Sequence, residues 1–414
     1  MAVRRIEPSH ASHLSRAHVL RGIVSLAFVG PAGCDEPPAP SSAPDVPFDL
    51  AAAAPRPAIA PVGVELDPAA PGTPDVLQLF RSEEQLFALT SRPLAPVTEN
   101  VGRYVYTLHV IDEASLTARA QTIPGCTELL GFAAKDGRRL ALCANGTERT
   151  ALLHDGVSWR RGAPLPGCTG DAPRPACVDR TTAAIACGHV AFVAERESAW
   201  RAFPFHRPPW GTCTSVALTS RSVLVGFSDG EWGGGMIRVD RRSGRQTTVD
   251  LGNSPPQVLE LRRTARDTVS VLASGTLIYE VRDGADMSVR VLATNLDLAQ
   301  ANALLEGSGK GPFRLPPFSD GHLTLPDGEF DAMSADGATL YAQDHGMLDL
   351  LHPEAASMAW SVARHAPSQR SDDPFQVSDV DVAGPTRVYV ATHDRGVVVF
   401  DRERKRAASV RFWQ

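Results

Sequence analysis

Seven side chains in turn-like segments are the residues best suited to bind a ligand: Asp229, Glu231, Trp232, Asp344, His345, His393 and Asp394. Imidazole and carboxylate groups ligate metal ions and hydrogen-bond to sugars, and an indole ring stacks on ligands. The turn at 228–235 also contains three consecutive glycines, which let a ligand approach the backbone closely. Such turns are commonly only solvated connections, so these residues are candidates and no more.

Known catalytic signatures do not assign a reaction. The sequence contains no HExxH motif, and its glycine-rich turn lacks the Gly-Lys-Ser/Thr sequence of a phosphate-binding loop. We therefore predict no catalytic residue, no cofactor and no resident metal ion. A hydrolase or lyase that uses carboxylates or histidines remains the alternative to a non-enzymatic function.

Six cysteines lie between residues 126 and 213: Cys126, Cys143, Cys168, Cys177, Cys187 and Cys213. The absence of a CxxC pair disfavours a zinc site, and an even number in an exported protein indicates disulfides. Fifteen connectivities are possible, and buried free thiols are the alternative. A turn at 135–138 separates Cys126 from Cys143, so we predict that these two bridge adjacent strands. By analogy Cys168 pairs with Cys187, which leaves Cys177 for Cys213.

The N-terminus indicates export. Residues 1–21 carry four arginines and one acid, and residues 22–33 are uncharged and mostly apolar. This apolar segment is shorter than the roughly 20 residues that span a bilayer, but it has the length found in signal peptides. Cys34 follows Ala32-Gly33, which resembles the bacterial lipoprotein signal. The resemblance implies that residues 1–33 are removed and that Cys34 is lipidated. Secretion without a lipid, or a cytoplasmic protein, are the alternatives.

We interpret residues 34–75 as a tether between this cysteine and a folded domain. The segment 35–75 contains eleven prolines and almost no strand pattern, so we expect the N-terminal segment to be disordered. The whole chain has a composition typical of a globular protein, at 43% hydrophobic and 21% charged residues. The net charge of −6 excludes the basic surface that nucleic acids require. We expect a location in the bacterial cell envelope, lipid-anchored or periplasmic or secreted, with membrane contact only through the lipid.

The elements that position the candidate residues are short β-strands that recur along the chain. A strand that mostly ends in a small residue returns with end positions 88, 143, 187, 226, 272, 342 and 391. Four of the six intervals lie between 39 and 49 residues, and turn sequences such as 282–285 separate the strands that follow. Four-stranded antiparallel sheets at this period, stacked around an axis, are the signature of a β-propeller. The sequence therefore predicts an all-β fold of seven blades over residues 76–414, with eight blades as the alternative.

One segment supports this architecture directly. Residues 388–401, Val-Tyr-Val-Ala-Thr-His-Asp-Arg-Gly-Val-Val-Val-Phe-Asp, resemble a blade of the YVTN/quinoprotein-like propellers, which are related to WD-repeat proteins. In a propeller the turns between the second and third strands of all blades share one face. That register places all seven candidate residues on one rim. We expect a protein or glycan partner to bind this loop-rich face.

The longest interval indicates an insertion at about 296–328. Residues 296–306 place Leu298, Ala301 and Leu305 on one helical face, so we predict a short helix there. Residues 307–328 are expected to be a glycine- and proline-rich loop.

Overall fold

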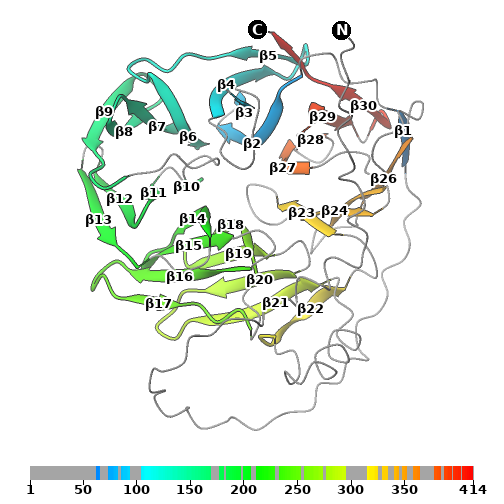
Figure 1. The fold of residues 1–414 in the computed structure, drawn as a ribbon. Helices are drawn as coiled ribbons and strands as arrows, with labels where there is room; N and C mark the ends of the chain where they lie inside the picture. The colour runs from blue at the N-terminus through cyan, green and yellow to red at the C-terminus, as the bar shows by residue number, and fades with distance from the viewer. Residues whose placement is uncertain are drawn as a thin grey trace, which may run out of the picture.

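A computed structural model describes residues 62–65 and 73–413, except 83–84, 94–103, 169–176, 181–182, 197–198, 207–210, 229–232, 253–255, 274–276, 295–314, 325–328, 334–339, 345–346, 352–357, 364–376, 384–386, 394 and 402. The described residues form strands joined by turns and contain no helix. They build seven four-stranded antiparallel blades in chain order around a common axis (Figure 1). The predicted all-β propeller fold is confirmed.

Each blade consists of four consecutive strands, numbered outward from the axis. Blade 1 contains β2 (Asp75–Ser82), β3 (Gln85–Pro93), β4 (Tyr104–Asp112) and β5 (Thr117–Ala120). Blade 2 contains β6 (Glu128–Lys135), β7 (Arg138–Asn145), β8 (Glu148–His154) and β9 (Trp159–Pro164). Blade 3 contains β10 (Cys177–Val178), β11 (Ala184–Cys187), β12 (Val190–Arg196) and β13 (Ala199–Pro204). Blade 4 contains β14 (Thr212–Leu218), β15 (Ser222–Ser228), β16 (Gly234–Asp240) and β17 (Gln246–Thr248).

The remaining blades follow the same order. Blade 5 contains β18 (Val258–Ala265), β19 (Thr268–Ala273), β20 (Leu277–Arg282) and β21 (Ser288–Thr294). Blade 6 contains β23 (Glu329–Met333), β24 (Leu340–Asp344), β25 (Met347–Leu351) and β26 (Met358–Ala363). Blade 7 contains β27 (Val377–Ala383), β28 (Arg387–Thr392), β29 (Gly396–Asp401) and β30 (Arg406–Ser409). Every end position of the repeat found in the sequence lies in the second strand of its blade.

The seven innermost strands close the ring. Each of β2, β6, β10, β14, β18, β23 and β27 contacts the innermost strand of the next blade, and β27 contacts β2. Since β18 and β23 touch each other directly, no room remains for an eighth blade between blades 5 and 6. The described residues therefore form a seven-bladed ring.

Three further strands add to the outer edges of blades, each in parallel pairing. β1 (Val62–Glu65) pairs with β26, β22 (Phe318–Thr324) pairs with β21, and β31 (Arg411–Trp413) pairs with β5. β1 lies within the segment predicted to be a strandless tether, and β22 lies within the predicted loop, so both predictions were wrong there. These strands form because open blade edges offer unpaired backbone groups. The predicted helix at 296–306 and the rest of the N-terminal segment lie outside the described residues.

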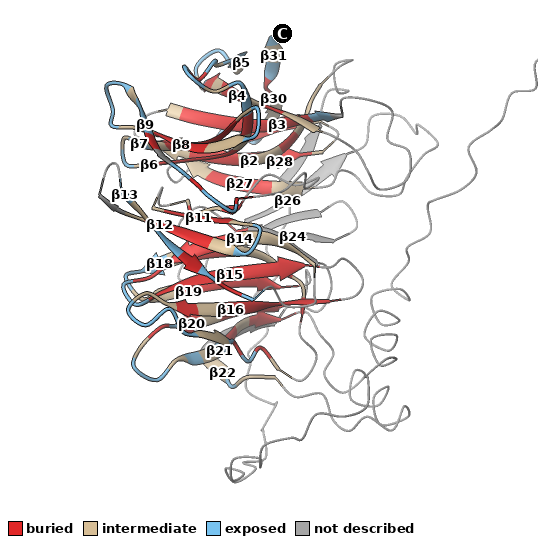
Figure 2. Ribbon diagram, turned by 60° about the vertical axis from the view of Figure 1, so that its left-hand side comes forward, coloured by how far each residue is buried: buried red, intermediate tan, exposed pale blue. Residues whose placement is uncertain are grey.

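The hydrophobic core lies between neighbouring blades. Clusters of buried side chains join blades 1 and 2, 2 and 3, 3 and 4, 4 and 5, and 7 and 1. All residues of β15 and β29 are buried because these strands have a blade packed on each face. Figure 2 shows the buried strand β15 in red. This accounts for the continuous apolar runs at 223–227 and 397–400, where a half-exposed strand would alternate.

The small residue within the second strand of blade 4 lies where the next blade packs closely. Gly226 of β15 faces Val258, the first residue of β18 in the following blade. A β-carbon at Gly226 would lie 2.4 Å from Cγ1 of Val258. At Gly226 the small residue of the sequence repeat is therefore a packing requirement of the interface between blades 4 and 5.

Candidate functional site

The described structure covers little of the predicted ligand-binding rim. Asp229, Glu231, Trp232, His345 and Asp394 lie outside the described residues. Asp344 ends β24, but its side chain is not among those described. His393 follows β28 and is half-buried. Burial raises the pKa of Asp75 in the next blade, and the neighbouring His393 opposes that rise. The topology places the ends of β24 and β28 on one face in adjacent blades.

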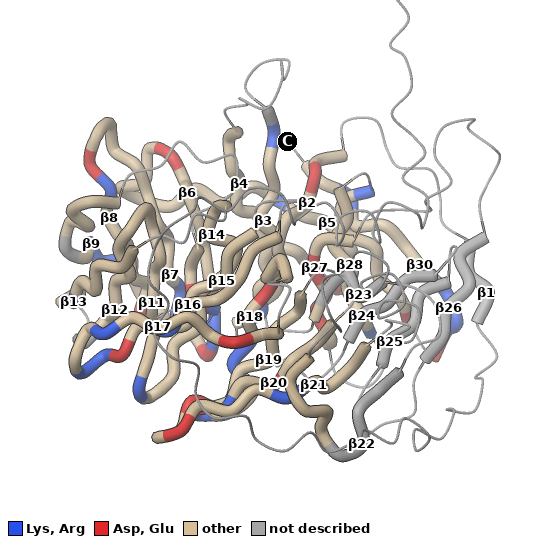
Figure 3. Tube along the Cα trace, turned by 60° about the horizontal axis from the view of Figure 1, so that its bottom comes forward, with Lys and Arg blue, Asp and Glu red and all other residues tan. Residues whose placement is uncertain are grey.

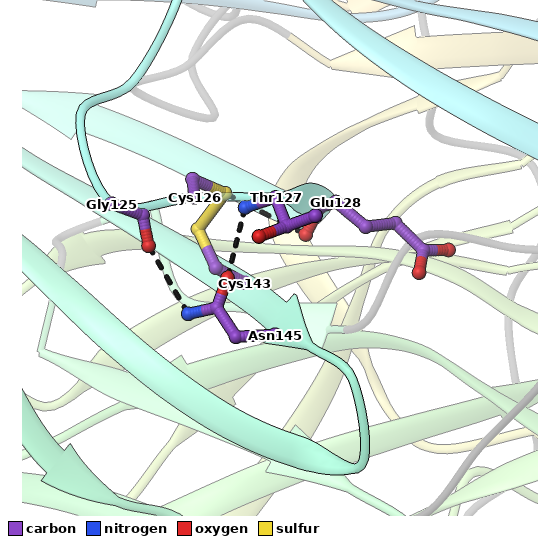
Figure 4. Close-up of a disulfide and its surroundings, with 6 residues drawn as sticks. All are labelled: Gly125, Cys126, Thr127, Glu128, Cys143 and Asn145. Carbon is purple, nitrogen blue, oxygen red and sulfur yellow. Dashed lines mark hydrogen bonds between the residues drawn. A yellow bond between two sulfur atoms is a disulfide. The ribbon is translucent and has the colours of Figure 1, made fainter.

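Asn145 lies on the same rim, and its side chain forms hydrogen bonds to the backbone of the protein (Figure 4). Its side-chain oxygen accepts a hydrogen bond from the backbone N–H of Thr127 at 2.9 Å, and its amide nitrogen donates to the carbonyl of Gly125 at 3.1 Å. The disulfide between Cys126 and Cys143 lies between these two contacts. The Asn145 amide therefore holds residues 125–127, which lead into the first strand of blade 2, against the end of β7.

The other two predicted disulfides are also confirmed. Cys168 bonds to Cys187 across a Cα–Cα distance of 4.9 Å, and Cys177 bonds to Cys213 across 6.3 Å. The last of these joins β10 to β14, so it links blade 3 to blade 4. The cysteines thus fasten both single blades and a blade interface.

A serine motif escaped the sequence analysis. Residues 226–230 match the GxSxG pattern of hydrolase nucleophiles, which requires a strand, a sharp turn and a helix around the serine. Here Ser228 ends β15, which pairs with the following strand β16 as a hairpin. Its buried hydroxyl also lies 3.1 Å from the amide oxygen of Gln257. The motif lacks the geometry of a nucleophile.

The most distinctive group of charged residues lies on the ring axis. It comprises Arg81, Glu113, Arg180, Glu260, Arg262, Asp379 and Asp381, which we call the axial ion cluster. Its members come from β2, the turn after β4, the residue pair after β10, β18 and β27. Blades 1, 3, 5 and 7 each contribute a side chain. The ion pairs therefore cross the centre of the ring.

Asp379 is the centre of the cluster and is fully buried. One carboxylate oxygen accepts hydrogen bonds from the Arg180 guanidinium and from the backbone N–H of Leu79, the latter at 2.7 Å. The other accepts from Arg262 at 3.0 Å and from the backbone N–H of Val380 at 2.9 Å. Burial raises the pKa of Asp379, and Arg180 opposes that rise. All four contacts are donors, which is the pattern that an ionised carboxylate needs.

A second set of contacts extends the cluster toward the face that carries the turns between first and second strands. Arg81 pairs with Asp381 at 2.8 Å and with Glu113 at 2.5 Å. The Tyr389 hydroxyl donates to Glu113 at 2.6 Å, and burial raises the pKa of this tyrosine. Glu260 accepts from the backbone N–H of Met333 at 3.1 Å, which ties blade 6 to the same network. The ion pairs thus link side chains of blades 1, 3, 5 and 7, and one backbone contact adds blade 6.

The sequence held a signal for this cluster that the analysis missed. Two innermost strands carry charged residues two positions apart, in Glu260-Leu-Arg262 and Asp379-Val-Asp381. A third carries one charged residue after apolar neighbours, in Leu79-Phe-Arg81. Residues at i and i+2 of a strand point to the same side. Glu260 and Arg262 therefore share one side of β18, and Asp379 and Asp381 share one side of β27.

Two surface grooves lie on the face formed by turns between first and second and between third and fourth strands. One, of about 830 Å³, lies between blades 1 and 2 and is lined by both acidic and basic side chains, including Glu113 and Arg139. The other, of about 470 Å³, lies between blades 3 and 4 and is lined by Arg201, Arg221, Arg241 and Arg242 with one acid, Asp240. In the part of the chain that the structure describes, no group of three or more His, Cys, Asp or Glu side chains is arranged to hold a metal ion. Nor do these described residues include a helix able to span a membrane.

The fold and these sites define a seven-bladed β-propeller with an ion-paired axis. No protein-family model matches the chain, and no curated protein matches it. The chain is similar to the solved structure of YCF48 from Cyanidioschyzon merolae, at 10% identity and a TM-score of 0.45, over 81% of this chain and 98% of that one. It is similar to a streptogramin B lyase structure at 8% identity and a TM-score of 0.44, over 79% and 93%. It is also similar to the computationally designed Ika8 protein at 11% identity and a TM-score of 0.39, over 82% and 99%.

Proposed function

We propose that this protein is a non-enzymatic β-propeller of the bacterial cell envelope, tethered through Cys34, that binds a protein or glycan partner. The partner contacts the face formed by the turns between second and third strands. The axial ion cluster is the observation that best supports a binding role. Its carboxylates accept from arginines and backbone N–H groups, so they are engaged in holding the blades together.

The disulfides support the envelope location. All six cysteines between residues 126 and 213 are paired. Structural disulfides form and persist mainly in oxidising compartments such as the periplasm or the cell surface. β1 shortens the proposed tether to residues 34–61, which still leaves a proline-rich segment between Cys34 and the ring.

The enzyme alternative has one observation in its favour. The carboxyl groups of Asp379 and Asp381 have pKa values raised by burial, and perturbed carboxyls gather at active sites. Ion-pair networks that stabilise a fold perturb pKa values in the same way. Since Asp379 is fully buried and both of its oxygens are occupied, it has no approach for a substrate, which favours the structural role.

The test compares the two faces of the full-length protein. Wild type, the double variant Trp232→Ala/His393→Ala and the opposite-face variant Val157→Ser are probed on a glycan array and by crosslinking to envelope extract. Val157 is 90% exposed in the β8–β9 turn, so its replacement should leave the fold unchanged. We expect the double variant alone to lose at least tenfold in affinity for the captured partner. Equal binding by all three proteins would contradict the proposed face. Turnover of a bound glycan by wild type would replace the proposal with the enzyme alternative.

A further inference from the structure

One asparagine of the rim has a neighbour that makes it chemically reactive. Asn145 is followed by Gly146, and none of the chain's other asparagines precedes a glycine. A glycine after an asparagine leaves the backbone nitrogen unshielded by a side chain, so this nitrogen can attack the carbonyl carbon of the asparagine amide. The attack releases ammonia and is the first step of deamidation. Asn145 is therefore the position where the sequence is most open to this modification.

The turn that contains this glycine is accessible to solvent. Asn145 ends β7 and pairs with Glu148, the first residue of β8, so Gly146 and Thr147 form a two-residue hairpin turn. Gly146 has a φ angle of 66°, and a β-carbon placed on it would meet no atom within 4 Å. Both turn residues are exposed. Water therefore reaches the site of the reaction, and the positive φ angle favours glycine at this position of the turn.

The side chain of Asn145 is held away from this turn. Its oxygen accepts from the Thr127 N–H, and its nitrogen donates to the Gly125 carbonyl (Figure 4). Both partners precede β6, on one side of β7, whereas the turn leads to β8 on the other side. For the attack, the side-chain carbonyl carbon must turn toward the Gly146 nitrogen, and this rotation breaks both hydrogen bonds. The native fold thus opposes deamidation.

The disulfide between Cys126 and Cys143 keeps these two hydrogen bonds in place. Cys126 lies between the two residues that Asn145 contacts, and Cys143 lies two positions before Asn145 in β7. The crosslink therefore fixes the segment 125–127 to the strand that carries the asparagine, with a Cα–Cα distance of 5.3 Å. Cys143 is buried, but Cys126 is only half-buried between exposed residues at 125 and 127, so a reductant reaches the bond from solvent.

We propose that Asn145 is a deamidation site that this disulfide keeps closed and that reduction of the disulfide opens. A dithiol reductant gives two electrons and two protons to the disulfide, which leaves two cysteine thiols, and the reductant itself becomes a disulfide. Once the freed segment moves away, the Gly146 nitrogen bonds to the side-chain carbonyl carbon of Asn145, and the amide leaves as ammonia with the proton of that nitrogen. Water then opens the cyclic imide to aspartate or isoaspartate. This chemistry takes place within the chain and is independent of the proposed partner.

Deamidation changes the rim permanently. Aspartate at position 145 has no N–H to donate, so a carboxylate oxygen faces the Gly125 carbonyl oxygen, and the segment 125–127 loses one of its two hydrogen bonds to the side chain. Basic and acidic residues are both distributed over the turns of blades 2 to 4 (Figure 3), so the added negative charge meets no surface of one sign and acts locally. Reoxidation restores the disulfide but not the amide. A reversible reduction is thereby converted into a lasting change of the loop-rich face.

The test is the rate of deamidation at Asn145 in the full-length protein, followed by mass-spectrometric peptide mapping. Wild type is incubated at mildly alkaline pH with and without dithiothreitol, and the variants Cys126→Ala/Cys143→Ala and Cys168→Ala/Cys187→Ala are incubated without it. The second variant lacks a different disulfide and is the matched control. We expect reduced wild type and the first variant to deamidate about tenfold faster than oxidised wild type, because local opening becomes more frequent, and the control to match oxidised wild type. Equal rates in the two variants, or in oxidised and reduced wild type, overturn the proposal.

A reciprocal measurement keeps the test decisive if a cysteine variant does not fold. Asn145→Ala removes both hydrogen bonds to the segment 125–127 and keeps every cysteine. We expect dithiothreitol to reduce its 126–143 disulfide about threefold faster than that of wild type, with the rate for the 168–187 disulfide unchanged as the internal control. Equal reduction of the 126–143 disulfide in the two proteins contradicts the role of Asn145 in holding the segment closed.

Discussion

Replacing Asp379 with asparagine should destabilise the ring strongly, although the side chain keeps its size. Arg180 and Arg262 carry two positive charges in the cluster centre, and Asp379 and Glu260 carry two negative charges. The substitution removes the buried carboxylate that Arg180 and Arg262 share, so Glu260 is the only carboxylate still paired directly with these two guanidinium groups among the described residues. Removing one partner of a buried ion pair costs about 3–5 kcal/mol of unfolding free energy. Only one side-chain oxygen remains an acceptor in asparagine, so the backbone contact from either Leu79 or Val380 is lost as well, which places the expected value in the upper half of that range.

The assay is equilibrium unfolding of the full-length protein in urea with its disulfides intact. The matched control is Glu148→Gln, which removes one carboxylate from an ion pair with Arg161 at 2.8 Å. Both side chains of that pair are largely exposed, at 41% and 61%, so the control should change the unfolding free energy by less than about 1 kcal/mol. The two substitutions are chemically alike and differ mainly in burial. The difference between them therefore measures the contribution of the axis.

A compensating substitution distinguishes charge imbalance from misfitting of the amide. In the double variant Asp379→Asn/Arg262→Met the remaining charges of Arg180 and Glu260 balance again. We expect the double variant to recover at least half of the lost stability, since buried ion pairs can be replaced by apolar side chains at little cost. A loss below about 1 kcal/mol in Asp379→Asn alone, or a further loss in the double variant, would refute the argument that charge balance holds the centre of the ring.

Three further outcomes follow from the structure. Gly226→Ala should cost about 1–3 kcal/mol because its β-carbon meets Val258, and melting curves of the double variant with Val258→Ala should show less than additive losses. Burial lowers the pKa of His109 to about 4, whereas the unfolded chain titrates near 6.5, so stability is complete above that pH and falls as the pH drops toward 4. This loss should reach about 3 kcal/mol in wild type and be absent from His109→Gln, with both proteins measured by unfolding at several pH values. Finally, labelled palmitate should be incorporated into wild type and not into Cys34→Ala; equal labelling of both would disprove lipidation.

The blades and disulfides were predictable because their determinants are local. A strand, a turn and a small residue recur within each blade, and the turn at 135–138 illustrates how directly the sequence specifies it. Asp136 and Gly137 both have positive φ angles, of 49° and 75°, and connect β6 to β7 as a two-residue hairpin. That geometry brings Cys126, two residues before β6, beside Cys143 of β7. The parallel strands β1 and β31 were not predictable in this way, because each needs an edge built elsewhere in the chain.

The axial ion cluster could not be predicted because its contacts join residues far apart in the sequence. Leu79 and Asp379 are 300 positions apart, and their hydrogen bond exists only once blade 7 lies beside blade 1. Arg180 and Arg262 reach the same carboxylate from blades 3 and 5, so their meeting point depends on the number of blades in the ring. In a ring of a different size the same charges would face other partners. Each arginine would then be buried without its counter-charge, at a cost of several kcal/mol. The cluster thus ties stability to closure with seven blades, and we infer that these charges select the ring size as well as filling its centre.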